Sequence, residues 1–289
     1  MRVAVLGLGL MGASLAWALR RRGLGPVAGY ARREETRRLA LERGVCDKVA
    51  DDPAAVVKDC QVAVVCTPVM VVPEILQRLV ARGKSRRLLV TDVSSTKNWV
   101  VERCEEICGT GAIRFLGSHP LCGSERAGLE NADPDLYEGA VTVLTPTPRS
   151  APSDVDLLAR LWGFVGSRVI RMPARAHDAV VARTSHLPHA LAALMVHLVD
   201  RGDVEQDGRL CGTGFRDASR IASGPSTVWR DIFLTNAEEM VDGLNAAVDQ
   251  LQRLREMIAS GRGEDVEAWL RKAAQLRGKI LGVAGKRAG

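Results

Sequence analysis

Aromatic side chains are scarce in this sequence, at 4% of 289 residues, and the basic residues are not gathered into a stripe. Nucleic-acid-binding proteins interleave basic and aromatic residues, so we expect no nucleic acid partner despite the formal net charge of +6. No apolar run approaches the ~20 residues that cross a bilayer. The N-terminus also lacks the apolar segment of a secretory signal. We therefore expect no membrane role and no export.

Cysteine gives no sign of a disulfide framework or a metal site. The seven cysteines are odd in number and scattered, which suits a reducing cytoplasm. Cys104 and Cys108 would share one helical face, but no second pair or nearby histidine completes a zinc site. We predict a cytoplasmic protein without a bound metal, whose positive charge suits anionic small molecules.

The N-terminus carries a glycine pattern between a strand and a helix. A buried strand is predicted at residues 2–6 and a helix at 13–19. G-x-G-x-x-G in this context is the fingerprint of dinucleotide binding, with the pyrophosphate at the helix N-terminus. We therefore predict a cofactor-binding turn made of Gly7, Leu8, Gly9, Leu10, Met11 and Gly12.

The end of the second predicted strand, at residues 27–30, indicates which cofactor is preferred. The acidic residue that binds the ribose 2′-hydroxyl of NAD is missing, and Ala31 is followed by Arg32 and Arg33. Two cations would accept a 2′-phosphate, so the pattern favours NADP over NAD. The alternative is that both arginines simply lie in solvent at the start of the next helix.

Strands and helices alternate up to residue 171. Further strands are predicted at 61–66, 87–92, 140–144 and 168–171, and helices at 34–43, 71–81, 98–108 and 153–165. This alternation predicts a Rossmann-type domain over residues 1–171, a parallel sheet covered on both faces. Cys66, Thr67 and Pro68 would lie beside the cofactor. The hydroxyl residues at 94–96 would cap the helix at 98–108 or point at the ribose or substrate.

From about residue 172 the strand patterns stop. Residues 174–199 are interpreted as two helices that meet near Pro188, and helices are predicted at 215–222, 227–260 and 264–280. An apolar stripe runs along the longest one, at Met240, Leu244, Val248, Leu251, Leu254 and Ile258. These stripes predict an all-helical substrate and dimerisation domain over residues 172–289, which packs against a second copy of itself.

Residues 115–125 place a histidine between two turn-forming segments. An apolar run ends in Gly-Ser, His119 follows, and Pro120 fixes the backbone. A neutral histidine at the end of a strand can accept a proton near pH 7 if it is aimed into a cleft. A lone histidine is nevertheless more often a structural residue.

Five motifs together resemble one family. They are the glycine turn at 7–12, DVSSTK at 92–97, GSHPLCGSE at 117–125, SHLPH at 185–189 and GFRDASRIA at 214–222. Their order resembles that of the prephenate/arogenate dehydrogenases, oxidoreductases of tyrosine biosynthesis, over nearly the whole chain. The resemblance implies that His119 accepts the proton of the substrate ring 4-hydroxyl and that Ser95 orients both. Hydride would leave C4 for the nicotinamide and CO₂ would leave C1.

The resemblance also implies a set of substrate-binding residues. Arg220 would bind a carboxylate of the dianionic substrate, and His189 would lie in the same pocket. Ser124 and Glu125 would line the entrance. His119 must be neutral to act, so activity is expected to fall below roughly pH 6.5.

Other functions remain open from the sequence alone. Arogenate differs from prephenate by an ammonium in place of a keto group, and nothing separates a prephenate, an arogenate and a dual-specificity cyclohexadienyl dehydrogenase. A β-hydroxyacid dehydrogenase or imine reductase would need a catalytic lysine in the helical half, where Lys272 and Lys279 lie only near the end. A non-catalytic NADP sensor would keep the glycine turn without needing His119 and Arg220.

Overall fold

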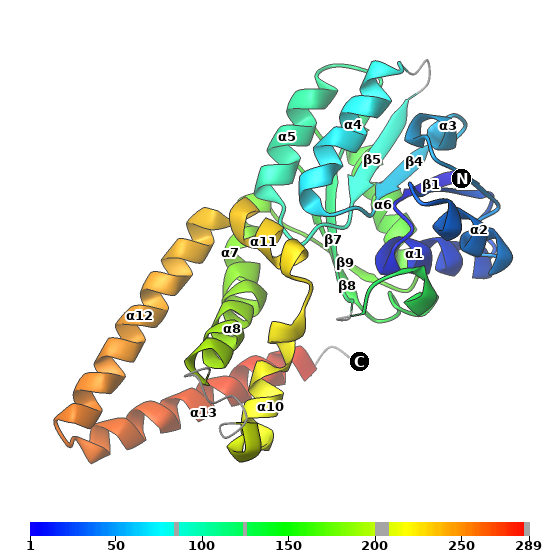
Figure 1. Ribbon diagram of the computed structural model, residues 1–289. Helices are drawn as coiled ribbons and strands as arrows, with labels where there is room; N and C mark the ends of the chain where they lie inside the picture. The colour runs from blue at the N-terminus through cyan, green and yellow to red at the C-terminus, as the bar shows by residue number, and fades with distance from the viewer. Residues whose placement is uncertain (84–86, 124–125, 200–207, 286–289) are drawn as a thin grey trace. The chain divides into compact units, whose positions relative to one another are not determined.

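The computed structural model describes residues 1–83, 87–123, 126–199 and 208–285 (Figure 1). The chain forms two compact units, Met1–Met240 and Val241–Gly289. This division is one of compactness and does not test the predicted assignment of residues 1–171 to the dinucleotide and 172–289 to substrate and dimer formation. That assignment stays a prediction.

Six parallel strands form the main sheet of the first unit, and four of them lie at the predicted strands 2–6, 27–30, 61–66 and 87–92. They are β1 (Val3–Leu6), β2 (Val27–Tyr30), β3 (Lys48–Ala50), β4 (Val62–Val65), β5 (Leu88–Asp92) and β6 (Ile113–Phe115). Their order is β3-β2-β1-β4-β5-β6, that of doubly wound dinucleotide-binding folds. Leu6 pairs with Tyr30 on one side and Val65 on the other, so the carboxyl ends of three strands meet at one edge.

Helices bury both faces of this sheet. One face carries α1 (Leu10–Arg21), α2 (Glu34–Glu42) and α6 (Pro152–Phe164), and the other carries α3 (Pro53–Val57), α4 (Val72–Ala81) and α5 (Asn98–Cys108). Val3 and Val5 of β1 point into the first core, while Ala4 and Leu6 point into the second. The strands are apolar without interruption because both faces are buried. Short 3₁₀ turns lie at η1 (Val69–Val71) and η2 (Leu129–Asn131).

A second sheet of three strands holds the histidine of the 115–125 segment. Its order is β7 (Gly117–Leu121), β8 (Val141–Thr145) and β9 (Arg168–Arg171), with β7 antiparallel to β8. The prediction that residues 140–171 continue the parallel sheet was therefore wrong. His119 does not follow a strand but lies inside β7, opposite Val143. Pro120 is tolerated beside it because β7 is an edge strand.

The helical part of the first unit begins with a helix that does not break at Pro188. α7 (Ala174–Val181) continues through the π turn η3 (Ala182–His186) into α8 (Leu187–Val199). A π turn changes the hydrogen-bonding step of the helix, and Pro188 lies at this change, where its missing N–H is tolerated. The sequence predicted two helices that meet near Pro188. A second α-helix does begin at Leu187, but the π turn joins it to the first without a break.

The predicted single helix at 227–260 is divided into two helices in the structure. After α10 (Thr213–Ser219) and η4 (Arg220–Ser223), α11 (Ser226–Thr235) ends at Asn236, and α12 (Ala237–Ala259) follows. Asn236 leaves the helical conformation, with φ −125° and ψ 37°. Its side-chain amide donates to the carbonyl oxygen of Asp178 at 3.0 Å. The interruption therefore turns a polar side chain into the interior.

The second unit contains most of α12 together with α13 (Gly263–Gly285). The indole Nε1 of Trp269 donates to Gln250 Oε1 at 3.4 Å. Large apolar side chains are exposed along both helices, at Val241, Leu244, Val248, Leu251, Ile258, Leu270, Leu276, Ile280 and Leu281. Among the helices of the described ranges, none combines the length and apolar character needed to span a bilayer.

Candidate active site

The glycine turn after β1 leaves room for an anionic group at the start of α1. Gly7 has a φ of 112°, and a Cβ on Gly12 would lie 1.9 Å from the carbonyl oxygen of Gly7, so both positions need glycine. A Cβ on Gly9 would meet nothing within 4 Å. No side chain caps α1, and its first turn holds no acidic residue. Its N–H groups therefore suit the pyrophosphate of a dinucleotide.

The end of β4 forms the floor of this turn. Burial, with a smaller effect of Asp92, raises the pKa of the Cys66 thiol, which stays neutral and packs as a small apolar group. The hydroxyl of Thr67 is buried and has no hydrogen-bond partner among the described residues. Pro68 follows and precedes η1. An orphaned hydroxyl at this edge fits a bound cofactor, because a ligand would supply its partner.

The side chains inside the turn are divided between core and site. Leu8 is buried and packs on Gly29 of β2, so its side chain belongs to the core. Leu10 and Met11 are half-buried. The carbonyl oxygen of Met11 accepts a hydrogen bond from the Tyr137 hydroxyl at 2.7 Å, which ties α1 to a later loop.

Arg32 and Arg33 lie exposed directly after β2, at the same edge of the sheet. Arg37 donates to the carbonyl oxygens of Ala31 at 2.9 Å and Arg32 at 2.8 Å and so holds this strand end. Within the part of the chain that the structure describes, neither the Arg32 nor the Arg33 guanidinium has a partner. Both cations are free to meet a phosphate.

His119 is buried at 8% exposure and is linked to a second histidine. Its Nδ1 lies 2.8 Å from Nε2 of His177, with the two rings edge to face. Burial, followed by the effects of His177, Lys97 and His186, holds the pKa of His119 well below its ordinary value. His119 is therefore neutral at pH 7, the form that a proton acceptor needs. The acid limit expected near pH 6.5 moves lower for the same reason.

A buried clamp holds the backbone just before His119. Asp92, at the end of β5, accepts from the Ser118 N–H at 3.1 Å, and the Ser118 hydroxyl donates to the Asp92 carbonyl oxygen at 2.6 Å. Lys97 Nζ donates to the Ser118 carbonyl oxygen at 2.9 Å and forms an ion pair with Asp92. Lys97 and Asp92 are both fully buried, at 0% exposure. Their bonds fix the start of β7, and with it the histidine.

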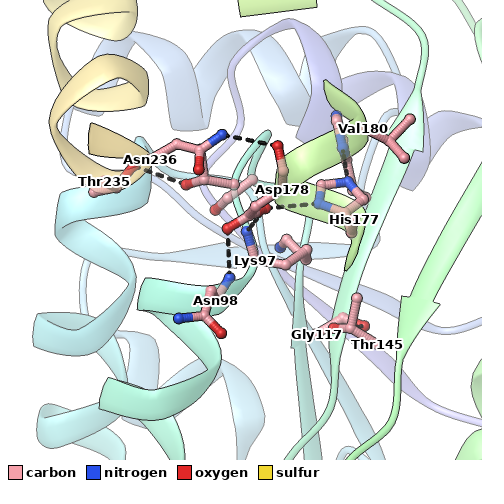
Figure 2. A network of polar contacts seen from close by, with 12 residues as sticks. Lys97, Asn98, Gly117, Thr145, His177, Asp178, Val180, Thr235 and Asn236 are labelled. Atoms are coloured by element: carbon pink, nitrogen blue, oxygen red, sulfur yellow. Dashed lines mark hydrogen bonds and ion pairs between the residues drawn. The ribbon is translucent and has the colours of Figure 1, made fainter. Parts of the chain in front are cut away.

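Asp178 of α7 connects His177 to the start of α5 (Figure 2). Its Oδ1 lies 2.7 Å from His177 Nδ1 and accepts from the Lys97 N–H at 2.7 Å, while Oδ2 accepts from the Asn98 N–H at 2.7 Å. The cap of α5 thus comes from another helix. The alternative that the hydroxyl residues at 94–96 supply it was wrong.

Those hydroxyl residues have separate environments. Thr96 shares a hydrogen bond with Thr235 of α11 at 2.8 Å. The Ser94 hydroxyl is buried without a partner in the described ranges, and Ser95 is half-buried in the same bend. Ser94 and Ser95 are therefore the two hydroxyl groups of this turn that can serve a ligand.

Two more histidines lie on η3 and α8. His189 is stacked on Trp229, with ring centroids 3.5 Å apart and planes at 13°. His186 Nδ1 lies 3.2 Å from the Asn236 side-chain nitrogen, which joins it to Asp178. His186 Nε2 and His189 Nδ1 are buried without partners among the described residues. Burial is the main cause that lowers the pKa of His186, to about 4, and burial also lowers that of His189.

Arg220 begins the η4 segment that ends against this stacked pair. A Cβ on Gly224 would lie 2.4 Å from Trp229 Nε1 and 3.2 Å from His189 Cε1. The Arg220 side chain is exposed and, across the described ranges, has no hydrogen-bond or ion-pair partner. Ser124 and Glu125 lie outside the described residues. No three potential ligands for a metal converge within the described part of the chain.

The sequence prediction missed Asp92, Lys97, His177 and Asp178. For Asp92 and Lys97 the signal was their place at the two ends of the DVSSTK motif, and for His177 and Asp178 it was a polar residue at a position where the helical pattern expects burial. Asp92 ends an apolar strand, and His177 and Asp178 lie on the buried face of α7 with Val181. Buried charges need partners, so these residues were candidates for a shared network.

Comparison with known proteins identifies the family of the chain. A family profile described as "Prephenate dehydrogenase, nucleotide-binding domain" matches residues 15–171, and one described as "Prephenate dehydrogenase, dimerization domain" matches residues 173–272. A prephenate dehydrogenase of Bacillus subtilis is 31% identical over 278 residues, 95% of this chain and 75% of the relative.

Two solved structures are similar over nearly their whole lengths. Prephenate dehydrogenase from A. aeolicus, in complex with hydroxyphenyl propionate and NAD⁺, is 33% identical with a TM-score of 0.89, covering 97% of this chain and 98% of that one. Synechocystis arogenate dehydrogenase is 28% identical with a TM-score of 0.83, covering 97% and 100%. The chain, an oxidoreductase with a domain for a nicotinamide nucleotide, therefore belongs to the prephenate dehydrogenase family.

Proposed function

We propose that this chain oxidises prephenate to 4-hydroxyphenylpyruvate and CO₂, in tyrosine biosynthesis, with His119 as the base. The observation that carries the proposal is a buried, neutral histidine tied to His177 and Asp178 in the same unit as the dinucleotide turn. A non-catalytic sensor would have no need of such an arrangement. Residues 1–171 would hold the cofactor, and 172–289 would hold the substrate and form the dimer.

The atoms of the reaction define what His119 must do. A bound nicotinamide supplies the acceptor for the hydride of C4. His119 Nε2 takes the proton of the 4-hydroxyl as that hydride leaves. The bond between C1 and its carboxylate then breaks, CO₂ departs, and the electron pair makes the ring aromatic. Because the product keeps a 4-hydroxyl, His119 returns the proton to the ring oxygen and ends the cycle neutral.

The other site residues bind and orient the substrate in this proposal. Ser95 would hold the 4-hydroxyl, and Arg220 would pair with a carboxylate of the dianion. His189, with its unpaired Nδ1, would face the ring or the side chain. Ser124 and Glu125 would lie at the entrance.

The proposed reaction is tested by incubating the protein with prephenate and either NAD⁺ or NADP⁺ and following absorbance of the reduced nicotinamide. We expect turnover that His119→Asn lowers by about 10²–10⁴-fold with little change in cofactor affinity. Arogenate in a parallel reaction decides between the prephenate, arogenate and dual-specificity alternatives. Cofactor binding without turnover of either substrate would refute the proposal in favour of a sensor.

The cofactor proposed is NADP in preference to NAD. The support is the two unpaired arginines after β2 and the absence of a carboxylate at residues 31–33. A charge-assisted contact contributes about 1.5–3 kcal/mol, so Arg32→Ser with Arg33→Ser should weaken NADP⁺ binding by at least ~10-fold and leave NAD⁺ nearly unchanged. Arg38→Ser is the control, since this exposed arginine pairs with Glu42. Equal losses for both cofactors would contradict the proposed preference.

The assembly proposed is a homodimer formed through the helical part. The support is the exposed apolar side chains of α12 and α13, which a soluble monomer rarely leaves uncovered. Analytical ultracentrifugation should find a dimer at micromolar concentration. A monomer under those conditions would remove this proposal.

A further inference from the structure

The hydrogen bonds of His119 lead to two residues that the proposed reaction does not touch. His177 and Asp178 are buried at 1% and 2% exposure, so water does not compete for their contacts. His119, His177 and Asp178 form a chain whose two links are 2.8 and 2.7 Å long. The direction of these links decides which nitrogen of His119 carries its proton.

The Asp178 carboxylate sets the direction at one end of the chain. The N–H groups of Lys97 and Asn98 can only donate, and they reach Oδ1 and Oδ2 respectively, each at 2.7 Å. Both carboxylate oxygens are therefore acceptors, and the facing Nδ1 of His177 must donate. A neutral His177 with its proton on Nδ1 has Nε2 as an acceptor.

The same logic fixes the tautomer of His119. The acceptor Nε2 of His177 lies opposite Nδ1 of His119, so this Nδ1 donates and Nε2 of His119 keeps its lone pair. When Nε2 takes a proton, the Nδ1–H bond to His177 remains as it was. The three side chains can therefore accommodate the new positive charge without rearranging their hydrogen bonds, which is the condition for an effective preorganised site.

We propose that His177 and Asp178 are positioning residues that hold His119 in the Nδ1–H tautomer and present its Nε2 as the proton acceptor. The kinetic consequence rests on the proposed function, whereas the tautomer does not. The charged and titratable groups that face His119 are His177 of α7, Lys97 before α5 and His186 of η3.

The tautomer is measured directly by long-range ¹H–¹⁵N NMR on the full chain labelled with [¹⁵N]histidine at pH 8. The chain holds five histidines, and the His119 signals are those that His119→Asn removes. We expect Nδ1 in the protonated range and Nε2 in the unprotonated range. The opposite pattern would overturn the proposal whether or not the protein turns over prephenate.

Paired substitutions at His177 test the kinetic role. His177→Leu removes the acceptor and should lower kcat by about 10–100-fold, with the substrate KM within twofold of wild type. In His177→Gln the amide can accept from His119 and donate to Asp178, so most of the rate should return. His197→Gln, at an exposed histidine, is the control.

The outcomes separate this inference from the proposed function. Wild-type kcat in His177→Leu, or a folded His177→Gln no faster than the leucine variant, would refute the positioning role. A wild-type protein without activity on prephenate or arogenate would refute the proposed function, and the NMR result would then decide the tautomer alone.

Discussion

A methyl group added at Gly12 or at Gly9 of the glycine turn should impair different properties, the stability of the fold in one case and cofactor binding in the other. In Gly12→Ala the new Cβ would lie 1.9 Å from the Gly7 carbonyl oxygen, where ordinary contact begins at 3.4 Å. Backbone cannot rotate away as a flexible side chain can, so we expect the upper end of the ~1–3 kcal/mol cost of overpacking. At about 2–4 °C per kcal/mol, the melting temperature should fall by roughly 6–12 °C.

Gly9→Ala should leave the fold intact and impair the cofactor site. Gly9 has φ −82° and ψ −162°, which alanine adopts freely, and its Cβ would meet nothing within 4 Å. The gain of ~0.4–1 kcal/mol from a less flexible unfolded chain roughly offsets the poorer cap that alanine provides. Stability should therefore change by less than about 1 kcal/mol. The methyl group would still occupy the space before α1, so cofactor affinity should fall at least ~10-fold.

Thermal melts without cofactor and calorimetric titration with NADPH measure the two effects separately. Gly163→Ala is the control, because this glycine of α6 also has nothing within 4 Å of its Cβ and lies away from the turn. Gly9→Ala with wild-type cofactor affinity would refute the placement of the phosphates over this turn. Gly12→Ala that melts like wild type would refute the packing argument.

Three further predictions concern buried polar groups. Because the pKa of His119 is lowered, the acid limb of kcat/KM should lie below pH 6.5, and a limb at or above 6.5 would contradict this. The free energy of unfolding should also decrease as the pH falls below 6.5, because His119 binds a proton in the unfolded chain and stays neutral in the folded one. Lys97→Met leaves Asp92 charged and buried, so urea unfolding should show a loss of about 3–5 kcal/mol, against less than ~0.5 for the exposed Lys48→Met. Thr67→Val removes an unpaired hydroxyl, so the free energy of unfolding of the cofactor-free protein should rise by about 1 kcal/mol while cofactor affinity falls several-fold. A less stable variant would mean that the hydroxyl has a partner.

The N-terminal fold could be predicted because each of its signals is local. The alternation of apolar strands and helices, and the glycine pattern between the first strand and the first helix, are properties of short segments. The second sheet could not be predicted, since a strand pattern does not state its partner, and β7 pairs antiparallel with β8 across 28 residues at Gly117 and Thr145. The interruption at Asn236 was hidden for a similar reason, because its cause is a bond to Asp178, 58 positions away.

The buried charges around His119 are better explained by a role in positioning this histidine than by a contribution to the stability of the fold. Lys97 takes part both in the clamp before His119 and in the hydrogen bonds of Asp178, since its Nζ pairs with Asp92 while its backbone N–H donates to Asp178. Replacing buried ion pairs by apolar residues is often neutral or stabilising, so the fold alone does not require them. The opposite charges of Asp92 and Lys97 balance each other, and the negative charge of the Asp178 carboxylate is not balanced by this pair. That remaining negative charge lies beside His177, at the end of the hydrogen-bonded series that begins at His119. In the proposed reaction it would stabilise the proton that His119 would take from the substrate and later return.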